Sequence, residues 1–586
     1  MGSIDTSTSD VLSTYSVPAE SEKLLAAELL ENPKIAKDIP SEAKDFVSRI
    51  KFTGTHLPSI PINWRFAESA ASLKAFEACI ISAFVKRKYD VELKGAEINT
   101  DHAQLFFMST LVWQIHPDTD HVITANLRGQ EKLFELIPNY DFHKMGSSPF
   151  RQAATNIYRT KDDRFFHLHG SMNPDPSLES LGFPEDRPEL TTWEEATQPF
   201  IDKMATIEAA EMQRLASDVY KQAGVIAETV DSFRASEHGK ANAHVGLFEI
   251  HAAPNPSQKP SWWLSTPQTS AARPLAGLKV VDLTRVIAAP AVTRGLAELG
   301  ASVMRVTSPK LVDYSVLHID LSWGKWQCSL DLKTEEGKAG LRELIKDADV
   351  VVQGYRPGVL DKYGFGQQGI IDLVKDRERG IISVRENCYG WNGPWEYRSG
   401  WQQISFDDSA GDNCVGISVG FGKAMGLKDN EAVTPVFPNS DYMTGIAGVT
   451  AILTALMRRA EEGGSFKVDV ALNYYNQWLA NSVGEYPEEI WQDVWKRNGK
   501  QVFRCHHNMG YLLPRYMEMI AKQGKLYQPA FFEDRESKAI GATVRTIKPI
   551  IKFDGDQVQL KYNVGTRGNG KDAARWPDDL MTEVVK

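Results

Sequence analysis

Hydrophobic positions follow a regular strand and helix pattern from residue 277 onward. Residues 277–283 form an apolar run that predicts a buried strand. Pro290 then starts a helix that we expect to end at Leu299, with Gly300 directly after it. The pattern continues with a strand at 302–306, a helix at 335–346 and strands at 349–352 and 380–384. Near-continuous apolar strands that alternate with helices predict an α/β fold with a doubly wound, parallel, Rossmann-like sheet.

A proline-rich stretch precedes this region. Prolines recur among Ser, Gln and Thr from Pro254 to Pro274, which excludes a continuous helix or an interior strand. The pair Trp262–Trp263 within the stretch indicates that it packs on a surface. We therefore predict four segments, namely an N-terminal extension at 1–52, a unit at 53–253, a linker at 254–273 and a second unit at 274–586.

The two units share a weak repeat. In the first unit, Pro61 precedes an apolar helix that ends in Lys86–Arg87. In the second unit, Pro435 precedes an apolar helix that ends in Arg458–Arg459, and a strand-like segment follows each of the two helices. Two ordinary amphipathic helices would produce the same pattern. The shared proline, helix length and following strand favour a duplication, in which 53–253 is a degenerate copy with a small-domain-like part and no recognisable ligand-binding βαβ region.

Composition and charge exclude several classes of protein. The 586 residues are 42% hydrophobic and 24% charged, which excludes intrinsic disorder of the whole chain. No stretch reaches the roughly 18 uncharged apolar residues of a membrane span. A net charge of −10 without a basic stripe argues against nucleic acid as a partner. Five scattered cysteines without CxxC spacing, and no apolar leader, predict reduced thiols in the cytoplasm.

Nucleotide and metal motifs narrow the choice of ligand. The predicted sheet favours a nucleotide-like ligand at the carboxyl ends of its strands. GxGxxG and GxxxxGK[ST] are both absent, which disfavours NAD and ATP. Arg356, after an apolar strand, is either a phosphate ligand or a solvated surface residue. The pairs His116/His121 and His506/His507 lack further ligands at structural zinc spacing, so no metal is assigned.

Six blocks in order give the chain a resemblance to a known family. It resembles the family III coenzyme A (CoA) transferases, or CaiB/BaiF family, which also includes formyl-CoA transferases and α-methylacyl-CoA racemases. The likeness is clear over about a third of the chain. The blocks are residues 274–286, 300–303, 329–337, 348–352 and 355–360, and the segment around Asp441.

The resemblance implies a substrate and its contacts. CoA or an acyl-CoA would be a substrate together with a carboxylic acid, and no cofactor would be bound permanently. Family members form interlocked homodimers, so one chain would hold both halves of such a unit, and whether two chains associate stays open. Ser308 lies where relatives often carry an adenine-stacking arginine. The implied CoA contacts are Arg285, Val286, Leu330, Lys333, Gly354, Tyr355, Arg356 and Lys362.

Asp441 is the candidate nucleophile. It follows Pro438 and opens an apolar helix, so the residues alone indicate a helix cap. The resemblance instead implies the catalytic aspartate of the family. We expect the helix N-terminus to keep this carboxylate ionised and to lower its pKa. An ionised carboxylate can attack a thioester to give an acyl anhydride, and the CoA thiolate then forms an aspartyl-CoA thioester.

Two departures from relatives bear on the acyl group. Trp401 lies where the racemases carry a histidine, and Ile287 lies where formyl-CoA transferases carry a glutamine. Both favour a bulkier or more apolar acyl group. The leading prediction is CoA transfer from an acyl-CoA to a carboxylic acid. The alternatives are a 2-methylacyl-CoA racemase or epimerase, for which the sequence reveals no proton-transfer partner of Asp441, and a non-catalytic acyl-CoA-binding protein.

Overall fold

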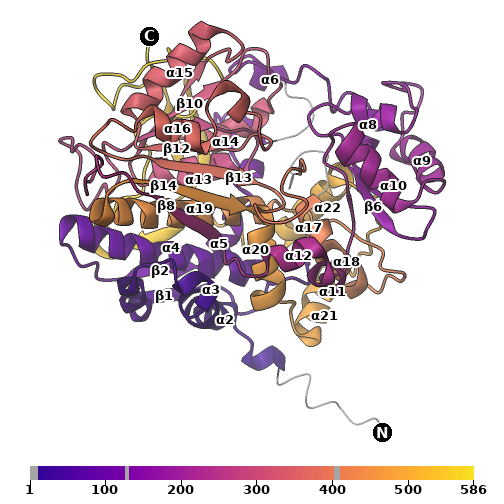
Figure 1. Cartoon of the computed structure of the whole chain (residues 1–586). Helices are drawn as coiled ribbons and strands as arrows, with labels where there is room; N and C mark the ends of the chain where they lie inside the picture. The colour runs from indigo at the N-terminus through magenta and orange to yellow at the C-terminus, as the bar shows by residue number, and fades with distance from the viewer. Residues whose placement is uncertain (1–10, 126–130, 401–409) are drawn as a thin grey trace.

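A seven-stranded sheet forms the centre of the molecule (Figure 1). The computed structural model describes residues 11–125, 131–400 and 410–586. The strand order is β11-β10-β9-β12-β13-β14-β8, and every pair is parallel except β14 with β8. The strands are β8 (Phe248–Ala253), β9 (Lys279–Leu283), β10 (Ser302–Thr307), β11 (Lys325–Ser329), β12 (Val350–Gln353), β13 (Ile382–Asn387) and β14 (Ser465–Ala471). The predicted α/β fold with a doubly wound, largely parallel sheet is confirmed.

Side chains of the central strands alternate between two apolar cores. Val280 of β9 packs into the core with α13 (Ala288–Glu298) and α19 (Asn439–Glu462), whereas Val281 faces α15 (Glu335–Asp347) and α16 (Gln367–Leu373). Because successive strand residues point to opposite faces, a strand covered on both faces is apolar throughout. The predicted helix boundaries hold to within two residues, and Gly300 has the positive φ of 109° that a residue after a helix end often adopts.

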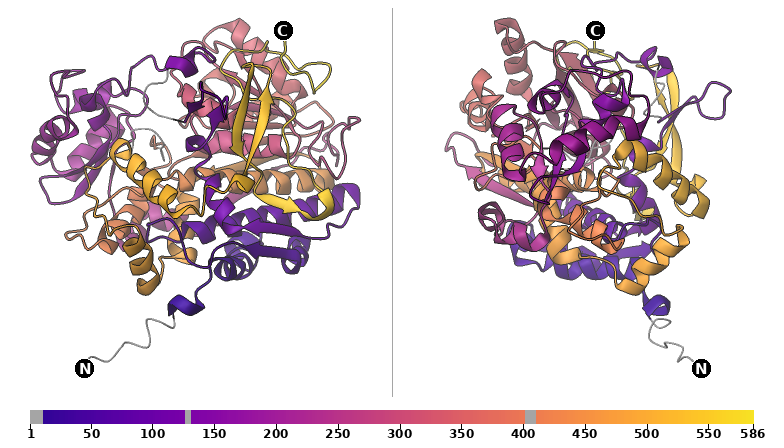
Figure 2. Two further views of the ribbon diagram at one scale, coloured as in Figure 1. Left: turned by 180° about the vertical axis from the view of Figure 1, so that it is seen from behind. Right: turned by 90° about the vertical axis from the view of Figure 1, so that its right-hand side faces the viewer.

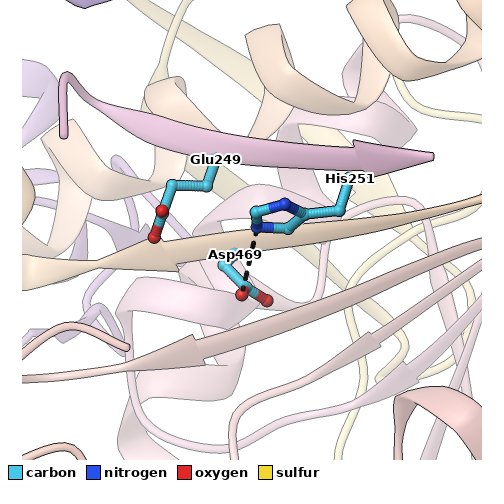
Figure 3. Close-up of side chains that lie close together, drawn as sticks. All are labelled: Glu249, His251 and Asp469. Atoms are coloured by element: carbon cyan, nitrogen blue, oxygen red, sulfur yellow. Dashed lines mark ion pairs between the residues drawn. The ribbon is translucent and has the colours of Figure 1, made fainter. Parts of the chain in front are cut away.

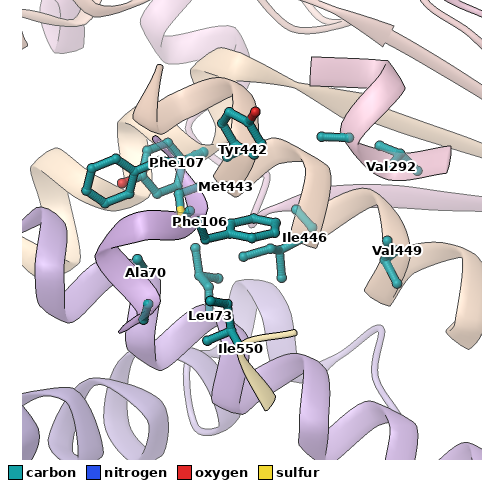
Figure 4. Close-up of a cluster of buried hydrophobic side chains, with 14 of the residues drawn as sticks. Ala70, Leu73, Phe106, Phe107, Val292, Tyr442, Met443, Ile446, Val449 and Ile550 are labelled. Atoms are coloured by element: carbon teal, nitrogen blue, oxygen red, sulfur yellow. The ribbon is translucent and has the colours of Figure 1, made fainter. Parts of the chain in front are cut away.

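Two long helices lie side by side below the sheet. Helix α4 (Phe66–Tyr89) packs along α19, and α5 (Thr100–Phe106) covers the start of α19. Figure 4 shows the apolar contact, in which Leu73 of α4 and Phe106 of α5 meet Tyr442 and Ile446 of α19. The ring centroids of Phe106 and Tyr442 are 5.2 Å apart. The 53–253 segment therefore covers the helix that begins near Asp441.

A buried polar network joins the same elements. Ser109, after α5, lies 2.7 Å from an Asp320 carboxylate oxygen and 2.8 Å from the Tyr442 hydroxyl. The Tyr442 hydroxyl also donates to Asp320 at 2.9 Å, and the Arg294 guanidinium donates to the same Asp320 oxygen at 2.5 Å. All four side chains are buried, so each polar group needs these partners.

Strands from distant parts of the chain complete the smaller sheets. β17 (Ile551–Phe553) pairs with β2 (Ala96–Asn99), which also pairs with β1 (Ile50–Thr53). β16 (Ala542–Ile547) pairs with β3 (Gln114–Ile115) and with β15 (Phe532–Ser537). Figure 2 shows these yellow C-terminal strands against the indigo and purple N-terminal elements. The two predicted units are interwoven, while their boundaries and the duplication stay predictions.

The proline-rich stretch packs closely on the molecule. Trp262 and Trp263 contact the Phe84 ring of α4 at centroid distances of 5.3 and 6.0 Å. The Trp263 indole N–H donates to the Ala276 carbonyl, and Lys88 lies over the Trp263 ring. A separate lobe (right in Figure 1) contains β6 (Phe165–Leu168) and the helices α8 (Asp175–Ser180), α9 (Trp193–Met204) and α10 (Ala209–Arg214). Within the described ranges, no helix is long and apolar enough to cross a membrane.

The Arg294–Asp320 pair allows a test of the core. Asp320→Asn would leave the buried Arg294 guanidinium without its carboxylate partner, and such a loss costs about 3–5 kcal/mol. We therefore expect a clear fall of the thermal denaturation midpoint, measured by circular dichroism. Asp347→Asn is the control, because Asp347 is 65% exposed and its pair with Lys279 at 3.3 Å is worth about 0–1 kcal/mol. Equal midpoints for the two variants would contradict the role of the pair.

Candidate active site

Asp441 lies in the first turn of α19. Pro438 occupies the N-cap position and Asp441 is the third residue of the helix, so Asp441 lies near the cap, as expected, but is not the cap residue itself. The fixed φ of proline suits the entry to a helix, which explains why α19 begins there. Asp441 is 3% exposed and faces a cavity of about 180 Å³.

The cavity lies at the carboxyl ends of β9, β12 and β13. Five of the predicted CoA contacts line it together with Asp441, namely Arg285, Val286, Gly354, Tyr355 and Arg356. These residues come from two loops, one after β9 and one after β12. In parallel sheets the carboxyl ends of neighbouring strands meet at one edge, which brings together residues that are distant in sequence.

The other three predicted contacts lie elsewhere. Leu330 and Lys333 line a second cavity of about 130 Å³ between the ends of β10 and β11, which Ser308 and Tyr355 also line. Tyr355 thus borders both cavities. Lys362 is exposed on a short 3-10 helix and lines neither cavity.

The turn after β9 has an unusual backbone. Val286 has a φ of 69°, in the left-handed region, where a β-branched residue is a strong outlier. Such a residue costs on the order of 1–3 kcal/mol and persists only where its surroundings hold it. Val286 is 8% exposed and packs in the main core. Ser171, after β6, also has a positive φ of 53° and lines the same cavity.

Arginines supply the positive charge of the cavity. Arg285 donates to the Val312 carbonyl at 2.7 Å, and its guanidinium lies 5.0 Å from the Tyr355 ring centroid. Burial, and then repulsion by Arg285, lowers the pKa of Arg356. Arg398 also lines the cavity, and its guanidinium makes no ion pair with the described residues. Three guanidinium groups therefore border a space suited to an anionic ligand.

Two carboxyl groups in the cavity titrate abnormally. Burial raises the pKa of Asp441 well above its ordinary value, and the nearby Glu386 and Asp412 raise it further. The expectation that the helix N-terminus lowers this pKa is therefore wrong, because loss of hydration outweighs the helix dipole. Burial also raises the pKa of Glu386, which lies on β13 and lines the cavity, to about 8.

The sequence interpretation did not identify Glu386, Arg398 or Ser171 as site residues. Glu386 carried a usable signal, because it belongs to the polar carboxyl end of β13, between Arg385 and Asn387. Arg398 lies in an irregular loop, and Ser171 comes from the small lobe, so neither stood out by pattern. Trp401, used above to argue against the racemases, lies outside the described residues.

A His–carboxylate cluster lies at the edge of the large sheet (Figure 3). Glu249, His251 and Asp469 offer ligand atoms within 4.8 Å of one another. The Arg385 guanidinium, however, donates to both Asp469 oxygens at 2.7 and 2.8 Å, and the Tyr474 hydroxyl donates to Glu249 at 2.6 Å. Arg385 compensates the charge of Asp469, and Tyr474 gives Glu249 a hydrogen bond, so we interpret the cluster as a polar contact that joins β8 to β14.

Comparisons with known proteins identify the family. A model of CoA-transferase family III matches residues 275–510. An acetyl-coenzyme A transferase from Hypoxylon pulicicidum is 49% identical over 97% of this chain and 95% of its own length. An acyl-CoA transferase from Gibberella moniliformis is 29% identical over 93% of both chains. A crystal structure of a CaiB/BaiF family protein from Brucella suis is 30% identical over 36% of this chain and 56% of its own, with a TM-score of 0.30. The chain belongs to CoA-transferase family III, the family that its sequence blocks predict, and it is a CoA-transferase.

Proposed function

We propose that the enzyme moves CoA from an acyl-CoA to a carboxylic acid and that Asp441 is the nucleophile. The observation that carries the proposal is the shared cavity, in which the Asp441 carboxyl group lies among Arg285, Tyr355 and Arg356. These arginines suit the phosphates of CoA, and Asp441 is the nucleophilic group at the start of a buried helix.

The chemistry proceeds through two covalent intermediates. The ionised Asp441 carboxylate attacks the thioester carbonyl, an O–C bond forms, the C–S bond breaks, and CoA leaves as a thiolate. The thiolate then attacks the aspartyl carbonyl, which gives an aspartyl-CoA thioester and releases the first acid. The acceptor carboxylate then attacks the aspartyl-CoA thioester, which gives a second anhydride and releases the CoA thiolate. The thiolate attacks the acceptor carbonyl of this anhydride, so the new acyl-CoA leaves and the Asp441 carboxylate is restored. Burial of Asp441 keeps water from the anhydride, which would otherwise hydrolyse.

We further propose a small, uncharged acyl group. Ile287, Ala288 and Leu472 contribute apolar surface to the cavity of about 180 Å³ beside Asp441. The name of the Hypoxylon relative, acetyl-coenzyme A transferase, supports a short acyl donor. The apolar lining supports the expectation from Ile287 of a more apolar acyl group, whereas a small group departs from the alternative expectation of a bulkier one.

A racemase of 2-methylacyl-CoA is a second candidate because Glu386 lines the same cavity as Asp441. The sequence revealed no proton-transfer partner for Asp441, and Glu386 is a group of that kind. A racemase exchanges the α-proton of its substrate with solvent deuterium, whereas a transferase forms an acyl adduct on Asp441. A non-catalytic binding protein does neither. Mass spectrometry of the protein and of a 2-methylacyl-CoA after incubation in D₂O separates the three functions.

The first prediction of the proposal concerns Asp441. Asp441→Asn should lower turnover by several orders of magnitude while CoA still binds, because an amide is a very poor nucleophile. Wild-type turnover should also fall as the pH falls through the raised pKa of Asp441, since protonation removes the nucleophile. Initial rates with acetyl-CoA from pH 5 to 9, and an acyl adduct that only wild type forms, check both points.

Stability provides the control for this variant. Folded Asp441 holds its proton to a higher pH than the unfolded chain does, so its ionisation costs stability as the pH rises above about 4. Asp441→Asn removes this cost and should melt at the same or a higher temperature than wild type at pH 8. An active Asn variant, checked by mass for deamidation, would show that Asp441 is not the nucleophile.

The second prediction concerns the CoA contacts. Arg356→Ala should weaken CoA binding about tenfold, because a charge-assisted hydrogen bond to a phosphate contributes about 1.5–3 kcal/mol. Lys362→Ala is the matched control, since Lys362 is exposed and lines neither cavity. Its CoA affinity should stay within about twofold of wild type in titration calorimetry. A large loss for Lys362→Ala with none for Arg356→Ala would overturn the assignment of the cavity to CoA.

A further inference from the structure

Glu386 lines the active-site cavity and forms no ion pair with any residue that the structure describes. It lies near the end of β13, after Ile382 and Val384, which are fully buried. A Cβ atom placed on Gly354 would lie 3.3 Å from a Glu386 carboxylate oxygen, so this carboxyl group borders the loop after β12. Within the described ranges its carboxyl group forms no ion pair and no hydrogen bond, and burial is the sole cause of its shifted pKa.

Charged and titratable groups from four elements share the cavity with Glu386. Asp441 comes from α19, and the Glu386 carboxyl group lies near enough to raise its pKa. Among the residues that the structure describes, the other titratable side chains that line the cavity are Arg285 after β9, Tyr355 and Arg356 after β12, Cys388 and Arg398 after β13, and Asp441 on α19.

Burial keeps Glu386 protonated at neutral pH. Its pKa of about 8 means that the neutral acid predominates near pH 7. A neutral carboxyl group has an O–H that donates a hydrogen bond, whereas a carboxylate only accepts. A neutral Glu386 also spares the Asp441 carboxylate a second negative charge in the same cavity. The chemistry needs the two acids in opposite states, with Asp441 ionised as the nucleophile and Glu386 protonated as the donor.

We propose that Glu386 is a second catalytic residue, whose carboxyl O–H donates a hydrogen bond to the oxyanion formed when Asp441 attacks the thioester. This proposal rests on the proposed role of Asp441. As the O–C bond forms, the carbonyl π electrons move onto the carbonyl oxygen, which then accepts the hydrogen bond. When the C–S bond breaks, these electrons restore the carbonyl and CoA leaves as a thiolate. Glu386 keeps its proton throughout, so the step needs no further reactant.

Glu386 is half-buried and lines the same cavity as Asp441, so it borders the space in which a thioester carbonyl would meet Asp441. Loss of one hydrogen-bond donor to an oxyanion slows catalysis by about 10²–10³. The same hydrogen bond would act on each of the later steps, because every exchange at Asp441 passes through an oxyanion. A residue that served only to fill the cavity would have no such effect on the rate.

Two substitutions test the proposal on the full-length enzyme with acetyl-CoA. Glu386→Ala removes the donor, and kcat should fall about 100- to 1000-fold while CoA affinity, measured by calorimetry, stays within about twofold. Glu386→Gln keeps an N–H donor of similar shape, and its rate at pH 7 should stay within about tenfold of wild type. Wild-type activity should fall as the pH rises through about 8, where Glu386 ionises, and this fall should be absent in Glu386→Gln.

Glu485→Gln is the matched control. Glu485 is a glutamate with an exposed side chain whose pKa is also raised, chiefly by loss of hydration, but it does not line the cavity. Its variant should keep both the rate and the alkaline fall of the wild type. Thermal denaturation of all variants checks that they fold, and if Glu386→Ala is unfolded, the pH profile of Glu386→Gln decides alone.

Three results would overturn the proposal. A wild-type rate for folded Glu386→Ala would show that the donor is dispensable. An alkaline fall that persists in Glu386→Gln would assign it to another group. A Glu386→Gln variant as slow as Glu386→Ala would show that the reaction needs a transferable proton and not only a hydrogen bond. Exchange of the substrate α-proton by the wild-type enzyme in D₂O would then indicate racemase chemistry. Failure of the proposed function itself appears differently, as a wild-type enzyme that forms no Asp441 adduct.

Discussion

Helices α13 and α19 cross so closely that glycines occupy their contact. A Cβ atom on Gly445 would lie 2.7 Å from the Ala291 Cβ, and one on Gly448 would lie 2.5 Å from a Val292 methyl carbon. Real side chains do not approach so closely, so this separation requires glycine. Helix α13 begins directly after the strained turn at Val286, and α19 carries Asp441 in its first turn. The crossing therefore sets the position of the candidate nucleophile relative to the loop that carries Arg285.

The burial that this packing creates also determines the charge state of the cavity. A helix N-terminus stabilises a nearby carboxylate by about 0.3–1 kcal/mol at an exposed site. Full burial shifts a carboxyl pKa by up to about 3–5 units, and each unit corresponds to about 1.4 kcal/mol. Loss of hydration is thus the larger effect at Asp441, which explains why its pKa rises although it lies in the first turn of α19. The arginines that line the cavity are then available to an anionic ligand.

The sequence predicted the features that depend on local pattern. The apolar runs of β9 to β13 and the helices between them follow from residue type and period, and Asp441 follows from the family blocks. The pairing of β8 with β14 and of β17 with β2 depends on contacts between residues hundreds of positions apart, which periodicity does not reveal. The pKa of Asp441 was predicted in the wrong direction because the sequence of α19 alone does not show that α4 covers this helix.

Both predicted units contribute to one cavity. Ser171 and Met172 from the 53–253 segment line it together with Asp441, and α4 from the same segment covers α19. A chain that held only residues 274–586 would expose the apolar face of α19 and open one wall of the cavity to water. Since the raised pKa of Glu386 depends on exclusion of water, the N-terminal segment acts on the chemistry without carrying the nucleophile. The 53–253 segment, for which the sequence predicts no ligand-binding βαβ region, therefore has a physical role in closing this wall of the cavity.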